Sequence, residues 1–73
     1  MRAVIKQKQG GTSVKRARLA LNMTQAQLAD AAGVCRAAVG KTENGLPIKS
    51  STAHKVAEAL GKDFGTLFEV VII

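Results

Sequence analysis

Apolar residues recur every three or four positions through the middle of this chain, which is the spacing of amphipathic helices. The clearest helical stretch begins at Thr24. Thr24 and Gln27, three residues later, form a capping box, which marks a helix start, and Gly33 supplies the left-handed residue that ends a helix. The apolar face of this predicted helix consists of Leu28, Ala29 and Ala32.

A second short helix is predicted directly after this one. Val34 is an apolar residue that can be buried in the turn, and the next helix begins near Cys35 or Arg36 and ends at Gly45. Two helices of this size joined by a glycine turn form a helix-turn-helix, whose second helix fits the major groove of DNA. The pattern from residue 24 to residue 45 therefore indicates a DNA-reading unit.

One further helix is predicted on the N-terminal side of this pair. Thr12 or Ser13 caps it, and it runs to about Leu21, where Asn22 tolerates the left-handed conformation and ends it. Its core-facing positions, at i, i+3 and i+7, are Val14, Ala17 and Leu21.

Two more helices are predicted on the C-terminal side. Leu46 and Pro47 break the chain, and a helix then begins near Ser50–Ser51 and ends at Gly61. Its apolar face consists of Ala53, Val56, Ala57 and Leu60. Asp63 caps a last short helix. The residues of this last helix that we expect to be buried are Phe64, Leu67 and Phe68.

The two ends of the chain predict strands. Residues 1–5 are mostly apolar, and Val70–Ile73 are all β-branched, which disfavours a helix. Between the first strand and the first helix, Lys6–Gly11 is polar and ends in two glycines, so we interpret it as a mobile arm or turn. We expect one domain of the all-α class, with residues 1–11 as strand and arm, 13–68 as helical core and 69–73 as a strand-like tail.

The terminal segments leave three arrangements open. Ala3–Ile5 and Val70–Ile73 could pair with each other, they could pair with their copies in a second chain, or the apolar tail could pack on its own domain. The marginal stability of a lone two-stranded ribbon in water favours the second arrangement, a homodimer. A chain of 73 residues buries only about 60% of its unfolded surface, and oligomerisation is a common remedy.

Charge and composition limit the classes of binding partner and the cellular compartment that we expect for this protein. The chain carries a net charge of +6 and a pI near 10.1, which favours an anionic partner, usually a nucleic acid. A single cysteine cannot form an internal disulfide. Lys6 and Lys8 make the N-terminal apolar run too short for a signal peptide. No segment approaches the roughly 20 apolar residues of a membrane span. We expect a cytoplasmic protein with no membrane partner.

Catalytic and cofactor chemistry finds no support in the sequence. One histidine and one cysteine are too few for a usual metal site, and no nucleophile–base pair or phosphate-binding glycine loop is present. Phe64 and Phe68 lie at i and i+4 in a core pattern, which argues against a stacking platform for single strands. We therefore expect no enzyme activity, no metal and no cofactor.

Short motifs along the chain resemble those of the Cro and lambda-repressor family of DNA-binding domains, also called the Xre family. The resemblance covers about residues 13–68. The matching motifs are Thr24-Gln25, Leu28-Ala29, Gly33-Val34, Glu43-Asn44-Gly45, the stretch from Lys55 to Leu60, Gly61 and Leu67-Phe68. The resemblance implies five α-helices, with the third as the recognition helix. The chain departs from the family in having Cys35 where a serine cap is common, Thr42 where a large apolar residue is usual, and Thr52–His54 smaller or more polar.

The expected base-reading residues lie on the third helix. Arg36, in the first turn, can bond a guanine bidentately, its neighbour Ala37 can touch a thymine methyl, and Lys41 can reach a base or a phosphate. Gly40 costs about 1 kcal/mol relative to alanine in mid-helix, so either DNA or the second helix must come close, and we favour packing against the second helix. Cys35 at the helix start is either a small turn residue, which we favour, or a redox-sensitive thiol beside DNA.

Further residues are expected to hold the phosphate backbone and the fold. The resemblance gives Gln25, beside Thr24 at the start of the second helix, a phosphate contact supported by the helix dipole. Asn44 and Lys49 are candidates for phosphate contacts from the loop after the recognition helix. Arg18 and Glu43 occupy positions that often form a buried ion pair in relatives.

The leading hypothesis is a sequence-specific regulator of double-stranded DNA, acting as a homodimeric repressor on a near-palindromic operator. The alternative is the antitoxin or interaction module of a toxin–antitoxin pair, with Val70–Ile73 as a strand that binds the toxin by edge addition. A third possibility is a transcription coactivator that contacts proteins without operator preference.

Overall fold

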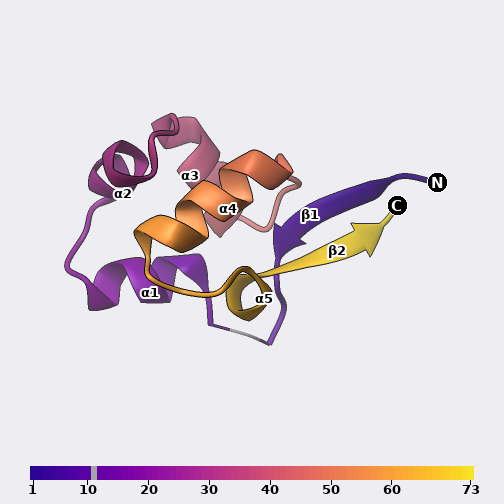
Figure 1. Ribbon diagram of the computed structural model, residues 1–73, viewed down its shortest axis with the longest axis horizontal. Coiled ribbons are helices and arrows are strands. Elements are labelled where there is room, and N and C mark those ends of the chain that lie inside the picture. Colours follow the sequence, from indigo (N-terminus) through magenta and orange to yellow (C-terminus); the bar gives the residue numbers. More distant parts are fainter. Residues whose placement is uncertain (11) are drawn as a thin grey trace.

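The computed structural model describes residues 1–10 and 12–73, and Gly11, the last residue of the predicted arm, lies outside the described residues. Five helices and one two-stranded sheet make up the described part of the chain. In Figure 1 the helices gather into one body and the two strands extend away from it together, with both termini at the tip. In chain order the elements are β1 (Ala3–Gln7), α1 (Val14–Ala20), α2 (Gln25–Ala32), α3 (Arg36–Glu43), α4 (Ser50–Ala59), α5 (Phe64–Leu67) and β2 (Phe68–Ile72).

Local capping signals decide the start of α1 and both ends of α2. The side chain of Ser13 accepts a hydrogen bond from the Arg16 amide at the start of α1, and Thr24 forms a capping box with Gln27 at the start of α2. At the end of α2, Gly33 has φ +71°, where a residue with a Cβ is strained. The predicted helix-turn-helix is confirmed, although α3 ends at Glu43 and the predicted end, Gly45, lies two residues beyond it.

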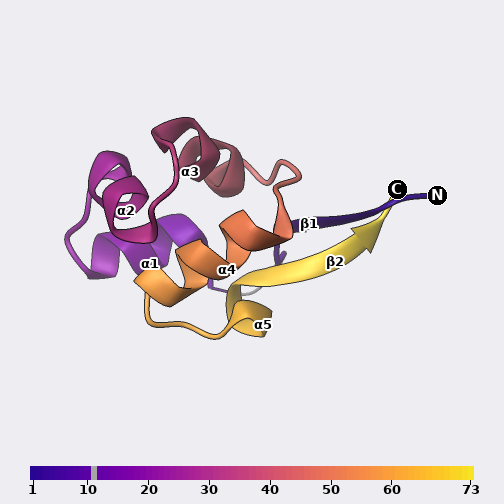
Figure 2. The same cartoon turned by 45° about the horizontal axis from the view of Figure 1, so that its top comes forward.

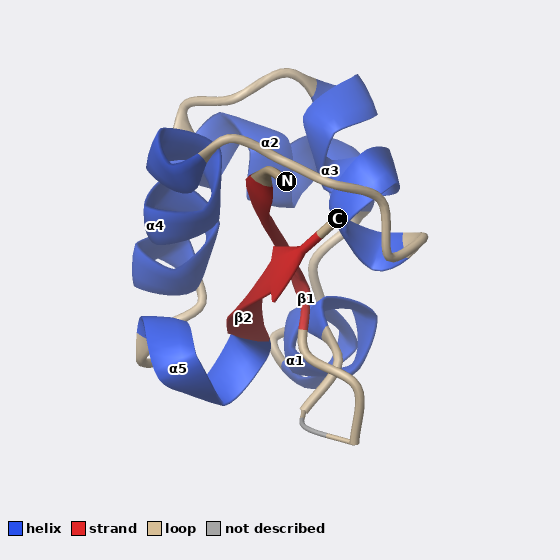
Figure 3. Cartoon of the chain, turned by 90° about the vertical axis from the view of Figure 1, so that its right-hand side faces the viewer, coloured by secondary structure: helices blue, strands red, loops and turns tan. Residues whose placement is uncertain are grey.

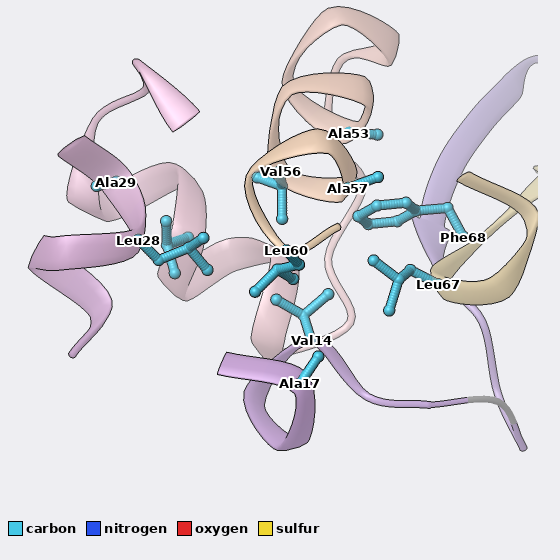
Figure 4. Close-up of a cluster of buried hydrophobic side chains, with 11 residues drawn as sticks. Val14, Ala17, Leu28, Ala29, Ala53, Val56, Ala57, Leu60, Leu67 and Phe68 are labelled. Carbon is cyan, nitrogen blue, oxygen red and sulfur yellow. The ribbon is translucent and has the colours of Figure 1, made fainter. Parts of the chain in front are cut away.

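The hydrophobic core lies between the helices and takes residues from all five of them. Figure 4 shows the side chains of α4 between those of α2 and those of Leu67 and Phe68, with Val14 and Ala17 of α1 beside them. The predicted core face of α4 is confirmed, since each of its four residues is buried. The core residues are Val14, Ala17, Leu28, Ala29, Val39, Ala53, Val56, Ala57, Leu60, Leu67 and Phe68.

Two predictions about the core were wrong. Leu21 is 52% exposed, because α1 ends at Ala20 and Leu21 is the C-cap, where the chain leaves the helical path that would have turned the side chain inward. Phe64 is only half-buried: it stacks on His54, with ring centroids 4.5 Å apart, at the edge of the core.

Thr42 fills a fully buried position on α3 in place of a larger apolar residue. Its hydroxyl donates a hydrogen bond to the Ala38 carbonyl oxygen at 2.7 Å. Because a buried polar group is costly only when it is left unpaired, this bond offsets most of the penalty of a hydroxyl in the core.

The terminal strands pair with each other in one antiparallel ladder, in which Ala3 lies opposite Ile72 and Gln7 opposite Phe68. β1 is longer than predicted. Lys6 and Gln7 belong to the strand and not to the arm, because they pair with β2 and because the Gln7 side chain accepts a hydrogen bond from the Val14 amide at 2.7 Å. Phe68 likewise begins β2 instead of ending α5.

The sheet lies between two groups of helices near its base. In Figure 3, α4 and α5 lie on one side of the strands, and α1 and α3 lie on the other. The fold therefore has the five helices that the resemblance to the lambda-repressor family implies, together with a short antiparallel sheet made from the chain ends.

Candidate nucleic-acid interface

Helix α3 has one buried face and one open face. Val39 and Thr42 are fully buried and hold the helix against the core. Figure 2 shows α3 on the outside of the helical body. The residues on its open side are Arg36, Ala37, Gly40, Lys41 and Asn44, all exposed except for Gly40, which is half-buried. The helix therefore presents two cationic side chains, with small residues between them, to the exterior.

A shallow groove of about 370 Å³ runs beside α3. Cys35, Ala37 and Lys41 line it on the α3 side, and Ile48 and Lys49 line it on the side of the loop that leads into α4. The expected phosphate residue Lys49 therefore shares one surface with Ala37 and Lys41, two of the three expected base-reading residues of α3.

The N-terminus of α2 and the C-terminus of α3 are joined by a buried polar network centred on Arg18. The Arg18 Nε atom donates to Glu43 Oε2 at 2.7 Å and its Nη2 atom donates to Glu43 Oε1 at 3.2 Å, with side-chain exposures of 8% and 6%. The Nη1 atom donates to the Met23 carbonyl oxygen at 2.8 Å. Arg18 therefore connects α1 to the segment before α2 and to the end of α3.

The pKa of the Arg18 guanidinium is raised above its ordinary value. The hydrogen bonds to Glu43 are the largest cause, burial opposes them, and the coulombic attraction of the carboxylate adds to them. The arginine end of the pair is therefore permanently charged.

Gln25 has a structural partner that sequence reasoning missed. Its side-chain amide donates to Glu43 Oε1 at 3.1 Å, so one of its two N–H groups is already used inside the protein. Because 18 residues separate Gln25 from Glu43, no local sequence signal points to this contact. The contact orients the glutamine at the N-terminus of α2, where its second N–H group is still available.

The expected packing reason for Gly40 was wrong. A Cβ atom built on Gly40 meets no atom within 4 Å, so α2 does not approach this position closely enough to exclude a side chain. The structure therefore gives no packing reason for a glycine at this position.

Cys35 is exposed at the N-cap of α3 and makes no capping hydrogen bond through its side chain. His54 and Phe64 stack on each other, and Phe64 also packs at 5.5 Å against the buried ring of Phe68, so the aromatic side chains are used in packing. Among the described residues, no three acidic, histidine or cysteine side chains gather as a metal site.

The longest described helix is α4, with ten residues. Within residues 1–10 and 12–73, no helix is both long and apolar enough to cross a bilayer.

In this chain an exposed basic helix, α3, follows the capped helix α2 across a glycine turn. This is the arrangement of helix-turn-helix DNA-binding proteins. A helix-turn-helix family model matches residues 14–67, and the chain belongs to the Cro/C1-type, or Xre, helix-turn-helix family. It is accordingly a DNA-binding transcriptional regulator and not an enzyme.

Among solved structures, the chain is similar to the transcriptional regulator VanUg in its crystal form II. The TM-score is 0.66 over all of this chain and 92% of that chain, at 16% sequence identity, so the likeness concerns the fold. A comparison with curated proteins gives no match.

Proposed function

We propose that this protein is a sequence-specific repressor that binds a near-palindromic operator in double-stranded DNA as a homodimer. The observation that carries the proposal is the open face of α3, where Arg36 and Lys41 point away from the core that Val39 and Thr42 enter.

Base reading is assigned to the first turns of α3. The guanidinium of Arg36 bonds the O6 and N7 atoms of a guanine, which contributes about 1–3 kcal/mol of discrimination against another base. Ala37 contacts a thymine methyl, and Gly40 lets the helix backbone lie close to the groove. Lys41, about 1.4 turns after Arg36, contacts a base edge or a phosphate at the other end of the same face.

Phosphate contacts are assigned to the residues that flank α3 in space. Thr24 and Gln25 lie at the N-terminus of α2, where backbone N–H groups and the helix dipole favour an anion. Asn44 and Lys49 follow α3 and reach the backbone on the other side. These contacts set the register of the protein on the duplex and carry no sequence information themselves.

The dimer follows from the size of the recognition surface. One α3 helix reads a few base pairs, whereas two helices related by a two-fold axis and about 34 Å apart read successive major-groove faces of a palindrome. A dimer bound over a promoter represses by excluding polymerase.

The proposal is tested by selecting bound sequences from random duplex DNA with the wild-type protein and with Arg36→Ala. Arg16→Ala is the matched control, because Arg16 is an exposed arginine on α1. We expect an inverted-repeat consensus for the wild type and for the control, and a relaxed preference at one position per half-site for Arg36→Ala. Identical consensus sequences and affinities for all three proteins would refute the assignment of α3.

A further inference from the structure

A groove of about 700 Å³ adjoins the C-terminal end of α3. Asn44 and Gly45 line it on the α3 side, and Lys6 of β1 and Glu69 of β2 line it on the side of the sheet. Asn44 is also the last residue on the open face of α3, and it is exposed. The groove therefore continues the open face of the recognition helix onto the terminal sheet.

Lys6 is held in place beside the loop that follows α3. The Ile5 carbonyl oxygen accepts a hydrogen bond from the Ile48 amide at 2.9 Å, so β1 is joined to that loop one residue before Lys6. Ile5 and Ile48 both pack against the core. Because successive side chains of a strand point to opposite faces of the sheet, Lys6 lies on the face away from Ile5. Its partner in the ladder, Glu69, lies on the same face and lines the same groove.

The fold leaves the charged end of Lys6 without a partner. The other lysine that lines the groove, Lys8, donates from its Nζ atom to the Gly65 carbonyl oxygen of α5 at 3.4 Å. Among residues 1–10 and 12–73, the Lys6 ammonium group takes part in no hydrogen bond and no ion pair. Lys6 is half-buried, which fits an aliphatic stem that packs along the groove while the ammonium group stays in water.

Two carboxylates also line the groove. Glu43 is paired with Arg18 and is therefore already neutralised. The Oε2 atom of Glu69 accepts a hydrogen bond from the Gln9 amide at 3.3 Å, and its carboxylate lies more than 4.0 Å from the Lys6 ammonium group. An anion in the groove is therefore attracted by Lys6 and repelled by Glu69.

We propose that this groove receives a phosphate of the DNA backbone, with the Lys6 ammonium group and the Asn44 side-chain amide as its hydrogen-bond donors. The inference rests on the DNA-binding face that the proposed function assigns to α3, and it extends that face to the terminal sheet. DNA is the occupant because the groove is continuous with the open face of α3, so a duplex lying along that helix brings its backbone to the groove. The contact sets the register of the protein on the duplex and reads no base.

The salt dependence of binding tests for a phosphate contact by Lys6. The wild type and Lys6→Gln are titrated between about 50 and 200 mM salt against a duplex selected by the wild type and against a scrambled duplex of the same length. Since one phosphate contact contributes about 0.9 to the log–log slope, we expect the affinity ratio of the two proteins to shrink by about 3.5-fold over this range. The same change is expected on both duplexes, because a phosphate contact carries no sequence information.

Matched variants separate a local contact from net charge and from folding. Lys62→Gln changes the net charge equally, and Lys62 is exposed between α4 and α5, helices that lie on the other side of the sheet from α3 in Figure 3. We expect Lys62→Gln and Lys6→Arg to keep the wild-type slope, with circular dichroism and melting used to verify the fold of each variant. Equal slopes for Lys6→Gln and Lys62→Gln would overturn the proposal, as would a loss of affinity shared by Lys6→Arg.

The opposing carboxylate gives an independent test. Glu69→Gln keeps an oxygen for the Gln9 amide and removes the negative charge from the groove. The control is Glu58→Gln, which removes an exposed carboxylate from α4. We expect Glu69→Gln to bind both duplexes about two-fold more tightly than the control at low salt, the effect of a unit charge at a distance of roughly 8 Å in water. Equal affinities would contradict a phosphate in this groove.

The outcomes separate this inference from the proposed function. A sequence preference that Arg36→Ala relaxes, together with equal slopes for Lys6→Gln and Lys62→Gln, would support the reading role of α3 and overturn the groove. A wild-type protein that selects no consensus would refute the sequence-specific repressor, and the slopes on the scrambled duplex would then decide the role of Lys6. A wild-type protein that binds neither duplex would overturn both.

Discussion

Replacement of Arg18 by alanine is the sharpest test of the polar network beneath the interface. The change removes the guanidinium that pairs with Glu43 at 2.7 Å and that satisfies the Met23 carbonyl oxygen at 2.8 Å. The Glu43 side chain is only 6% exposed, and of its hydrogen-bond partners in the network only the Gln25 amide remains. The variant therefore retains a buried carboxylate without a compensating charge.

Breaking a buried pair in this way costs on the order of 3–5 kcal/mol. A 73-residue domain at about 0.05–0.15 kcal/mol per residue has a total free energy of unfolding of roughly 4–11 kcal/mol. Since about 1 kcal/mol lowers Tm by roughly 4–8 °C in a domain of this size, we expect Arg18→Ala to lower Tm by at least about 12 °C or to unfold the protein.

The assay is thermal and urea unfolding of the wild type, Arg18→Ala, Glu43→Ala and the double variant. Because the double variant no longer buries a lone charge, we expect it to be less destabilised than the sum of the single variants, with an interaction energy of about 0.5–3 kcal/mol. A Tm of Arg18→Ala within a few degrees of the wild type, or strictly additive effects, would show that the pair contributes nothing to stability.

Three further predictions concern the interface and the same pair. Gly40→Ala should raise the free energy of unfolding by about 0.5–1 kcal/mol, because a Cβ meets no atom there, and should weaken DNA binding; unchanged affinity would exclude close approach of DNA at this position. Lys49→Ala should weaken binding equally to all sequences and reduce the log–log salt slope by about 1, whereas an altered consensus would contradict a phosphate contact. Because the pKa of Arg18 is raised in the folded state, its charge contributes its full stabilisation at every pH below the pKa of Arg18 in the unfolded chain. That stabilisation is lost only as the pH rises through the pKa of the folded state. A double-mutant-cycle energy that falls between pH 7 and pH 10 would contradict this prediction.

Several features of the fold were predicted from short stretches of sequence because the interactions that decide them are local. The capping box of Thr24 joins residues three apart, and Gly33 needs no partner to adopt a positive φ. The apolar face of α4 follows from spacing alone, since a helix brings every third or fourth residue to one side. These signals also predicted that α3 would follow a glycine turn.

Other features depended on where the elements lie relative to one another. The exposure of Leu21 depends on where α1 ends, since the helix stops at Ala20, one residue before the predicted end. Apolar residues at both termini predicted strands, but the extension of β1 through Gln7 came from its pairing with a strand 61 residues away at Phe68.

The sequence by itself determined the class of this protein: helical spacing of apolar residues, the side-chain caps of two helices and a basic third helix after a glycine turn are properties of neighbouring residues. The tertiary structure alone decided the hydrogen bond from Gln25 to Glu43, the open space around Gly40 and the groove that Lys6 shares with Asn44. Each of these depends on the separation between elements far apart in the chain, and that separation is set by how the whole core packs.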